Sequence, residues 1–185
     1  MNNILLLLKI IISPILCVLC IYFIIDDLSY YPLSFGLIIG LVNWYYHKYN
    51  PFLGVILSLI VSYITFFIAY FSLLITGEIF NFLSDLGHII ALIISAFIIA
   101  PLLVFFAYKF VFNYPKTKLT IYIILFSVIL LVLQAYFFFN YDDFILTDLN
   151  KSKIVNPFTI WQVIMALSLQ LIITQRIKKE KNLAK

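Results

Sequence analysis

The chain has 185 residues, of which 65% are hydrophobic and 11% are charged, and its mean hydropathy is +1.13. Ordinary soluble domains are about 45–50% apolar and about 25% charged. The composition therefore excludes a soluble globular domain and indicates a protein of the lipid bilayer. The net charge of +4 does not predict contact with nucleic acid, because the lysines gather at the ends of apolar segments, where membrane topology accounts for them.

Six apolar segments follow one another along the chain, and we interpret each as a transmembrane helix. A helix crosses the hydrocarbon core with roughly 17–25 residues. The spans are predicted at 4–25, 30–46, 52–76, 88–112, 119–139 and 158–175. The predicted fold class is therefore all-α, a polytopic helical protein of the inner or plasma membrane, with residues 1–185 forming a single transmembrane domain.

The second segment is the shortest of the six. Its apolar run, residues 33–46, reaches the length of a span only when residues 30–32 are added. The run ends on Trp44, Tyr45 and Tyr46, and aromatic side chains of this kind are typical of the membrane interface. A crossing helix is therefore favoured over a re-entrant loop.

The basic residues orient the six helices, because cytoplasmic loops of membrane proteins carry an excess of Lys and Arg. With both termini in the cytoplasm, ten of the twelve basic residues are cytoplasmic, and only Lys151 and Lys153 are not. The ten are Lys9, Lys48, Lys109, Lys116, Lys118, Arg176, Lys178, Lys179, Lys181 and Lys185. Five spans would separate the basic tail from Lys116 and Lys118, so we predict six spans with both ends inside.

Residues 176–185 form a basic cytoplasmic tail in this topology. The cations Arg176, Lys178, Lys179 and Lys181 are predicted to dock on anionic lipid headgroups or on a soluble cytoplasmic protein. The simpler interpretation is that the tail only anchors the topology.

Two of the spans begin with the same tripeptide, Asn-Pro-Phe, at residues 50–52 and 156–158. Asn suits the N-cap of a helix, and Pro suits the first helical position. These two spans have opposite orientations, so an inverted repeat of three plus three helices is one interpretation. The halves align poorly beyond the tripeptide, which favours a common helix-start signal used twice.

Small residues recur at helical spacing on two neighbouring spans. Gly36 and Gly40 form G-x-x-x-G in the second span, and Gly54, Ser58 and Ser62 form G-x-x-x-S-x-x-x-S in the third. Such stripes let two helix backbones approach closely. We expect them to pair helices within the chain or between subunits, and we expect a homo-oligomer.

Uncharged polar residues interrupt the spans, whereas charged residues are nearly absent from them. The amides Asn43, Gln134, Gln162 and Gln170 are predicted to hydrogen-bond across helices or, in the alternative, to line a polar pore. The near lack of charge argues against a proton-coupled pump.

Two prolines lie inside predicted spans, Pro14 in the first and Pro101 in the fourth. Each is expected to kink its helix and to free a backbone carbonyl.

The first span contains a C-x-x-C motif. The hexapeptide from Cys17 to Tyr22 contains both cysteines of the motif, Cys17 and Cys20. It resembles the redox-active segment of disulfide bond formation protein B, a quinone-coupled membrane oxidase. The resemblance implies that the two cysteines pass electrons to a quinone. It covers six residues, the family's second cysteine pair is missing because the chain has no other cysteine, and Phe23 stands at the start of the stretch where the family has an arginine. The other interpretation is two buried thiols that act as small hydrophobic side chains.

The sequence contains no set of residues with the spacing of metal ligands, no nucleophile beside a base and no phosphate-binding loop. We therefore expect a non-enzymatic membrane scaffold or sensor subunit, without a cofactor, that couples to a cytoplasmic partner. Short loops between apolar segments are typical of bacterial phage-defence membrane subunits and of immunity proteins against toxins. The alternative is a small transporter or channel component that binds a substrate, and a quinone-linked thiol oxidase is the remote one.

Overall fold

The long apolar stretches of the sequence are helical in the computed structural model of the chain. The backbone is described for residues 3–23, 28–115, 117–140 and 156–183, and the side chains for 7–23, 29–115, 117–139 and 156–175. Within these residues the secondary structure is helix and short turns, with no strand. The predicted all-α class is therefore confirmed.

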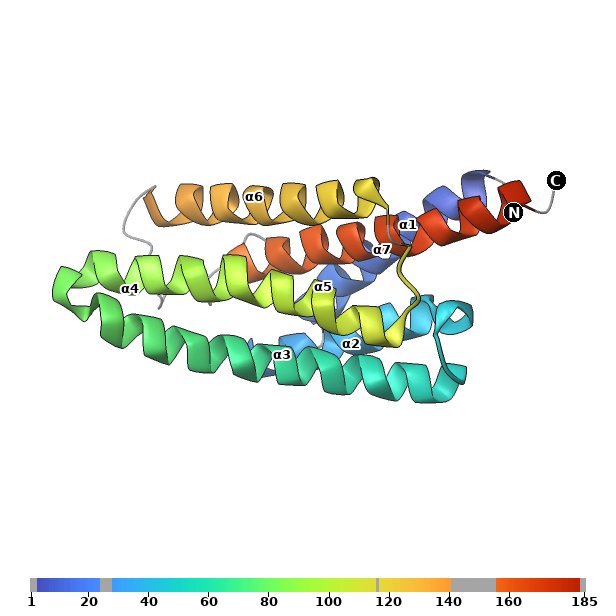
Figure 1. Cartoon of the computed structure of the whole chain (residues 1–185). Helices are drawn as coiled ribbons and strands as arrows, with labels where there is room; N and C mark the ends of the chain where they lie inside the picture. Colours follow the sequence, from blue (N-terminus) through green and yellow to red (C-terminus); the bar gives the residue numbers. More distant parts are fainter. Residues whose placement is uncertain (1–2, 24–27, 116, 141–155, 184–185) are drawn as a thin grey trace.

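The helices follow the predicted spans closely. They are α1 (Asn3–Phe23), α2 (Tyr31–Val42), α3 (Pro51–Phe80), α4 (Asp85–Leu92), α5 (Ala100–Val111), α6 (Lys118–Asn140) and α7 (Pro157–Leu183). A π-helical segment, η4 (Ile93–Ile99), joins α4 to α5, and the three form one continuous helix (Figure 1). Single 3-10 turns are η1 (Leu28–Tyr30), η2 (Trp44–Tyr46) and η3 (Asn81–Leu83).

The described helical segments run in alternating directions (Figure 1). α1, α3 and α6 begin at the right-hand end of the view, where α2, α5 and α7 end. We call this the basic end, because the segments that meet there carry Lys9, Lys48, Lys109 and Lys118. The alternation is the one that six crossings of a bilayer would produce.

Four helices are long and apolar enough to cross a membrane: Pro51–Leu83, Asp85–Val111, Lys118–Phe139 and Pro157–Gln175. The length and composition of these helices fit the prediction of transmembrane helices. α1 has 21 residues in all, of which Leu7–Phe23 have described side chains, and Tyr31–Val42 is shorter. α2 has 12 residues, which rise only about 18 Å against a hydrocarbon core of about 30 Å. Six spans therefore remain a prediction.

Two helix starts depend on the asparagines identified in the sequence. The N–H of Phe52 donates to Oδ1 of Asn50 at 3.1 Å, and the N–H of Phe158 donates to Oδ1 of Asn156 at 2.8 Å. The proline that follows each asparagine opens its helix, where a missing N–H costs no helical hydrogen bond. Both predicted helix starts are confirmed.

The small-residue stripes of α2 and α3 pack against each other within the chain. A Cβ atom at Gly36 would lie 2.7 Å from the carbonyl oxygen of Ser58, and one at Gly40 would lie 3.1 Å from Cα of Val55. Ser62 lies on the same face of α3, and a Cβ atom at Gly36 would come within 2.9 Å of its Oγ. These faces are therefore covered inside one chain, and a homo-oligomer would have to use another surface.

Gly54, the first member of the α3 stripe, faces the turn at the basic end. A Cβ atom there would overlap the imidazole ring of His47. The ring of His47 stacks on Phe112, and its Nε2 lies 3.0 Å from the carbonyl oxygen of Gly40. Burial lowers the pKa of His47, and the hydrogen bond to Gly40 opposes this shift. His47 therefore ties together the ends of α2 and α5 and the start of α3.

One hydroxyl pair locks α3 to α5 in the core. The side chain of Tyr108 is fully buried, and its hydroxyl lies 2.7 Å from Oγ of Ser62. Around it lies a continuous apolar cluster that includes Phe35, Phe97 and Met165. The other two helices are held by this bundle, since α2 packs along α3 and α1 packs along α7.

Replacing Gly36 with alanine is expected to lower the thermal stability of the protein in detergent. The added methyl group meets the backbone of α3, which cannot rotate away, and overpacking of this kind costs about 1–3 kcal/mol. Gly77 is the matched control in α3, because a Cβ atom there meets no atom of the described residues within 4 Å. Gly77→Ala should raise stability by about 0.5–1 kcal/mol. Equal melting temperatures for the two variants would contradict the α2–α3 contact.

Candidate functional site: a pocket beside the π-helical segment

Pro101 interrupts the hydrogen bonds of the α4–α5 helix. The N–H of Ala100 donates to the carbonyl of Ser95, five residues earlier, which is the π-helical pattern. Ala96 is the next acceptor in this pattern, but Pro101 has no N–H to offer it. The freed carbonyl that the sequence leads us to expect therefore lies at Ala96.

Trp161 on α7 supplies the missing donor. Its indole Nε1–H donates to the carbonyl oxygen of Ala96 at 2.9 Å. In hydrocarbon, an unsatisfied backbone carbonyl costs several kcal/mol. The indole therefore braces α7 against the π-helical segment at the one carbonyl that the proline leaves open.

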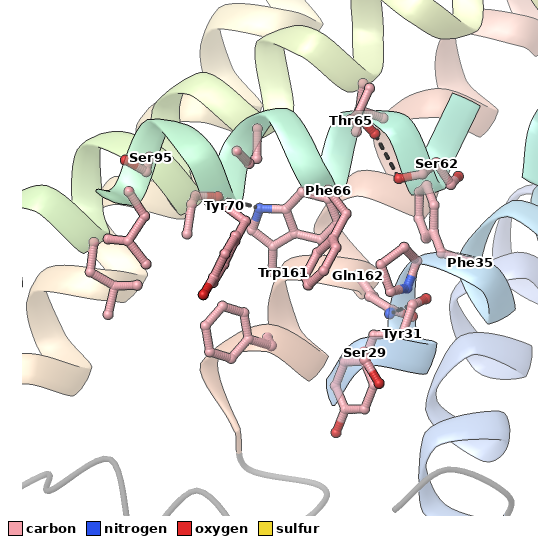
Figure 2. A pocket seen from close by; sticks show the side chains of 18 residues that line it. Ser29, Tyr31, Phe35, Ser62, Thr65, Phe66, Tyr70, Ser95, Trp161 and Gln162 are labelled. Carbon is pink, nitrogen blue, oxygen red and sulfur yellow. Dashed lines mark hydrogen bonds between the residues drawn. The ribbon is translucent and has the colours of Figure 1, made fainter. Parts of the chain in front are cut away.

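A pocket of about 340 Å³ lies beside this brace. Figure 2 shows Trp161 in the middle of its wall, with Ser95 toward one side and Phe35 toward the other. Its walls come from the start of α2, the second half of α3, the η4–α5 region and the start of α7. Pockets that bind small molecules measure about 300–1,000 Å³, so this one is large enough for a ligand.

Small side chains leave the pocket open. Ala69 on α3, Ala96 on η4 and Ala100 on α5 line it between larger aromatic side chains such as Phe66 and Trp161. The π-helical segment adds residues to the helical turn and therefore widens the helix at this point. The hollow thus follows from alanines placed opposite one another and from a helix that departs from α-helical geometry.

The polar groups of the pocket wall bond mainly to one another or to the backbone. Oγ of Ser95 lies 3.3 Å from Oγ of Ser72 and 3.0 Å from Oγ1 of Thr76. Thr65 donates to the carbonyl of Ser62, as Figure 2 shows. Nε2 of Gln162 donates to the carbonyl of Tyr31 at 2.9 Å. The surface that faces the hollow is therefore largely hydrocarbon.

The structure does not bring the four predicted amides together. Gln162 lines the pocket, whereas Gln134 donates to the carbonyl of Pro157 and Gln170 donates to Oγ of Ser13. Asn43 donates to the carbonyl of Ile39 and caps the end of α2. Each of these amides thus donates a hydrogen bond to a different acceptor, and the four do not line a single pore.

The oxygen atoms of all four amides are buried and have no hydrogen-bond partner among the described residues. Because the pattern repeats at Asn43, Gln134 and Gln170, far from the pocket, the oxygen of Gln162 does not by itself mark a ligand. It does leave an acceptor beside the hollow.

The other sequence candidates lie away from the pocket. Pro14 is buried in α1, beside the Ser13 hydroxyl that binds Gln170. Cys17 is fully buried in the core and Cys20 is half-buried, and both are free thiols. No group of three or more His, Cys, Asp or Glu side chains lies together in the described part of the chain.

The predicted docking residues of the tail, Arg176, Lys178, Lys179 and Lys181, have side chains that lie outside the described residues. The backbone of α7 continues to Leu183, so most of the tail is a helical extension of α7. Lys116, Lys151 and Lys153 are also outside the described part.

Sequence reasoning missed Trp161 and the alanines that shape the pocket. The signal available was Pro101, which indicates a freed carbonyl but does not name its partner. Comparison with protein families, curated proteins and solved structures gives no match to this chain.

Trp161→Phe is expected to destabilise the protein, because it leaves the carbonyl of Ala96 buried and unpaired. The cost should be about 1–3 kcal/mol. In a Pro101→Ala background the N–H of residue 101 is available to the freed carbonyl, so the same substitution should cost less. A double-mutant cycle read by detergent unfolding measures this difference. Identical costs in the two backgrounds would show that the indole does not compensate for the proline.

Proposed function

We propose that the protein is a six-span membrane protein with both termini in the cytoplasm, which acts as a non-enzymatic scaffold or sensor and binds a soluble partner at its basic end. One observation carries this proposal. Lysines of α1, α5, α6 and the α2–α3 turn belong to one end of the bundle, whereas Asp85 begins α4 at the other end (Figure 1).

The packing of α1 and α2 supports six crossings. α1 lies along α7 and α2 lies along α3, and each partner is one of the four long apolar helices. A short helix inside a bundle has its backbone bonds satisfied and its flanks covered, so it can complete a crossing with the 3-10 turns at its ends. η1 and η2 extend α2 in this way over residues 28–46.

The basic end offers a cationic surface that suits an acidic partner. The side chains of Lys48, Lys109 and Lys118 are exposed there. Nζ of Lys9 lies 3.4 Å from the centroid of the Tyr46 ring, which holds this cation against η2. Complementary charge steers association and selects the partner. A role in phage defence or toxin immunity remains a prediction from the build of the chain.

The second candidate is a substrate-binding component of a small transporter or channel. The pocket beside Gln162 favours it, because a purely structural bundle has no need of a ligand-sized hollow. In this case the pocket, and not the basic end, carries the function.

Neutralising the tail is expected to release the cytoplasmic partner. A variant with Arg176, Lys178, Lys179 and Lys181 all changed to glutamine should lose the soluble protein that the wild type retains in mild detergent, because the charge attraction is removed. Affinity purification with mass spectrometry measures this loss.

The matched control changes Lys151 and Lys153 to glutamine, since these lysines are predicted to lie on the other side of the membrane. This variant should retain the partner. Retention by the tail variant, or equal loss from both variants, would show that the tail does not dock a partner.

A further inference from the structure

The pocket beside Trp161 lies inside a bundle that we place in the membrane, and its lining identifies the chemistry of its occupant. Carboxylate, ammonium and guanidinium groups are absent from the described residues that line it. A charged ligand would lose its hydration there without meeting an opposite charge. The occupant is therefore apolar over the part that enters the pocket.

The hydrogen bonds of the wall strengthen this conclusion. The indole N–H of Trp161 is directed to the Ala96 carbonyl, and the Ser95 hydroxyl bonds with hydroxyl groups of α3. The amide N–H of Gln162 is directed to the Tyr31 carbonyl. These three donors are thus already used, and the rest of the wall is largely hydrocarbon, so shape and hydrocarbon contact dominate recognition.

The pocket has an edge at the lipid-facing surface. Tyr70 lines it and is 50% exposed, and Phe71 and Leu74, which follow on α3, are also exposed. In a bilayer these exposed side chains face acyl chains. An apolar molecule that enters beside Tyr70 therefore comes from the surrounding lipid, where acyl chains are far more abundant than any other apolar group.

We propose that this pocket binds one acyl chain of a membrane lipid, whose headgroup remains outside. A cavity of about 150 Å³ lined by apolar side chains already binds benzene, and this one measures about 340 Å³. The chain fills the hollow that the alanines leave and contacts the face of Trp161. The inference rests on the proposed membrane placement and not on the cytoplasmic partner.

The test uses the fluorescence of Trp161 in vesicles of phosphatidylcholine brominated on one acyl chain, because bromine quenches a tryptophan that it contacts. The chain has two tryptophans, so Trp44→Phe leaves Trp161 as the sole emitter. Strong quenching is expected for this parent protein. Ala69→Leu and Ala100→Leu fill the pocket from two different helices, and each should lose part of the quenching, while the pair should lose most of it.

Two controls separate the pocket from lipid in general. Ala107→Leu adds the same side chain to α5 at a half-buried position that does not line the pocket, and it should leave quenching unchanged. In a Trp161→Phe background, Trp44 at the basic end reports insertion into the vesicle, and neither filling substitution should alter its quenching. Melting temperatures show that the filled variants are folded, as the free volume of the pocket allows.

The outcomes are distinct. Quenching of Trp161 that is lost in the filled variants and kept in Ala107→Leu supports the acyl-chain site. Quenching of Trp161 that is equally strong in the filled variants overturns it. So does absence of quenching in the parent protein when Trp44 is quenched in the Trp161→Phe background. Absence of quenching at both tryptophans would instead contradict the membrane placement itself.

Discussion

The structure depends on one constraint: inside hydrocarbon, each backbone N–H and C=O group must find its partner within the protein. Helices meet this constraint by themselves, which is why the apolar stretches become helices. At Pro101 the backbone of its own helix cannot meet this constraint. Pro101 cannot serve Ala96, and an indole from another helix takes over. A side-chain N–H thus repairs the hydrogen bond that the backbone cannot make.

That repair also shapes the site. A regular α-helix at residues 93–99 would be narrower, and Pro101 would then leave the carbonyl of Phe97, and not that of Ala96, without a donor. With the π-helical segment in place, α7 and α3 are held apart around small side chains, and a pocket remains. Elsewhere the opposite solution is used, since Gly36 and Gly40 bring α2 and α3 into close contact. The same bundle therefore contains one tightly packed pair of helices and one hollow.

Much of the fold could be predicted from the sequence, because it depends on local features. Hydropathy locates the helices, and Asn50 and Asn156 fix two helix starts through hydrogen bonds to residues only two positions away. Length is harder, because α2 is shorter than a bilayer and depends on α3 beside it. A stripe such as Gly36 and Gly40 predicts close packing but does not name the helix that approaches.

The site could not be predicted, since the residues that form it are far apart in the sequence. Gln162 and Gln134 look equivalent in sequence, yet one lines a pocket and the other bonds a helix start. Which amide lines a pocket depends on how α7 is rotated about its axis against α2 and α3. A hydropathy pattern does not determine this rotation. Trp161 lies next to Gln162, and no local feature of the sequence sets it apart from the other aromatic residues of the spans.

The central claim is that the alternating helices cross the membrane six times with the basic end in the cytoplasm. Cysteine accessibility tests it most directly, in a background with Cys17→Ala and Cys20→Ala and one new cysteine at a time. An impermeant thiol reagent should label Asn3→Cys, Lys48→Cys and Asn113→Cys only from the cytoplasmic side, and Ser84→Cys only from the opposite side. Labelling of Asn3→Cys and Lys48→Cys from opposite sides would show that only one of α1 and α2 crosses, and would contradict the account.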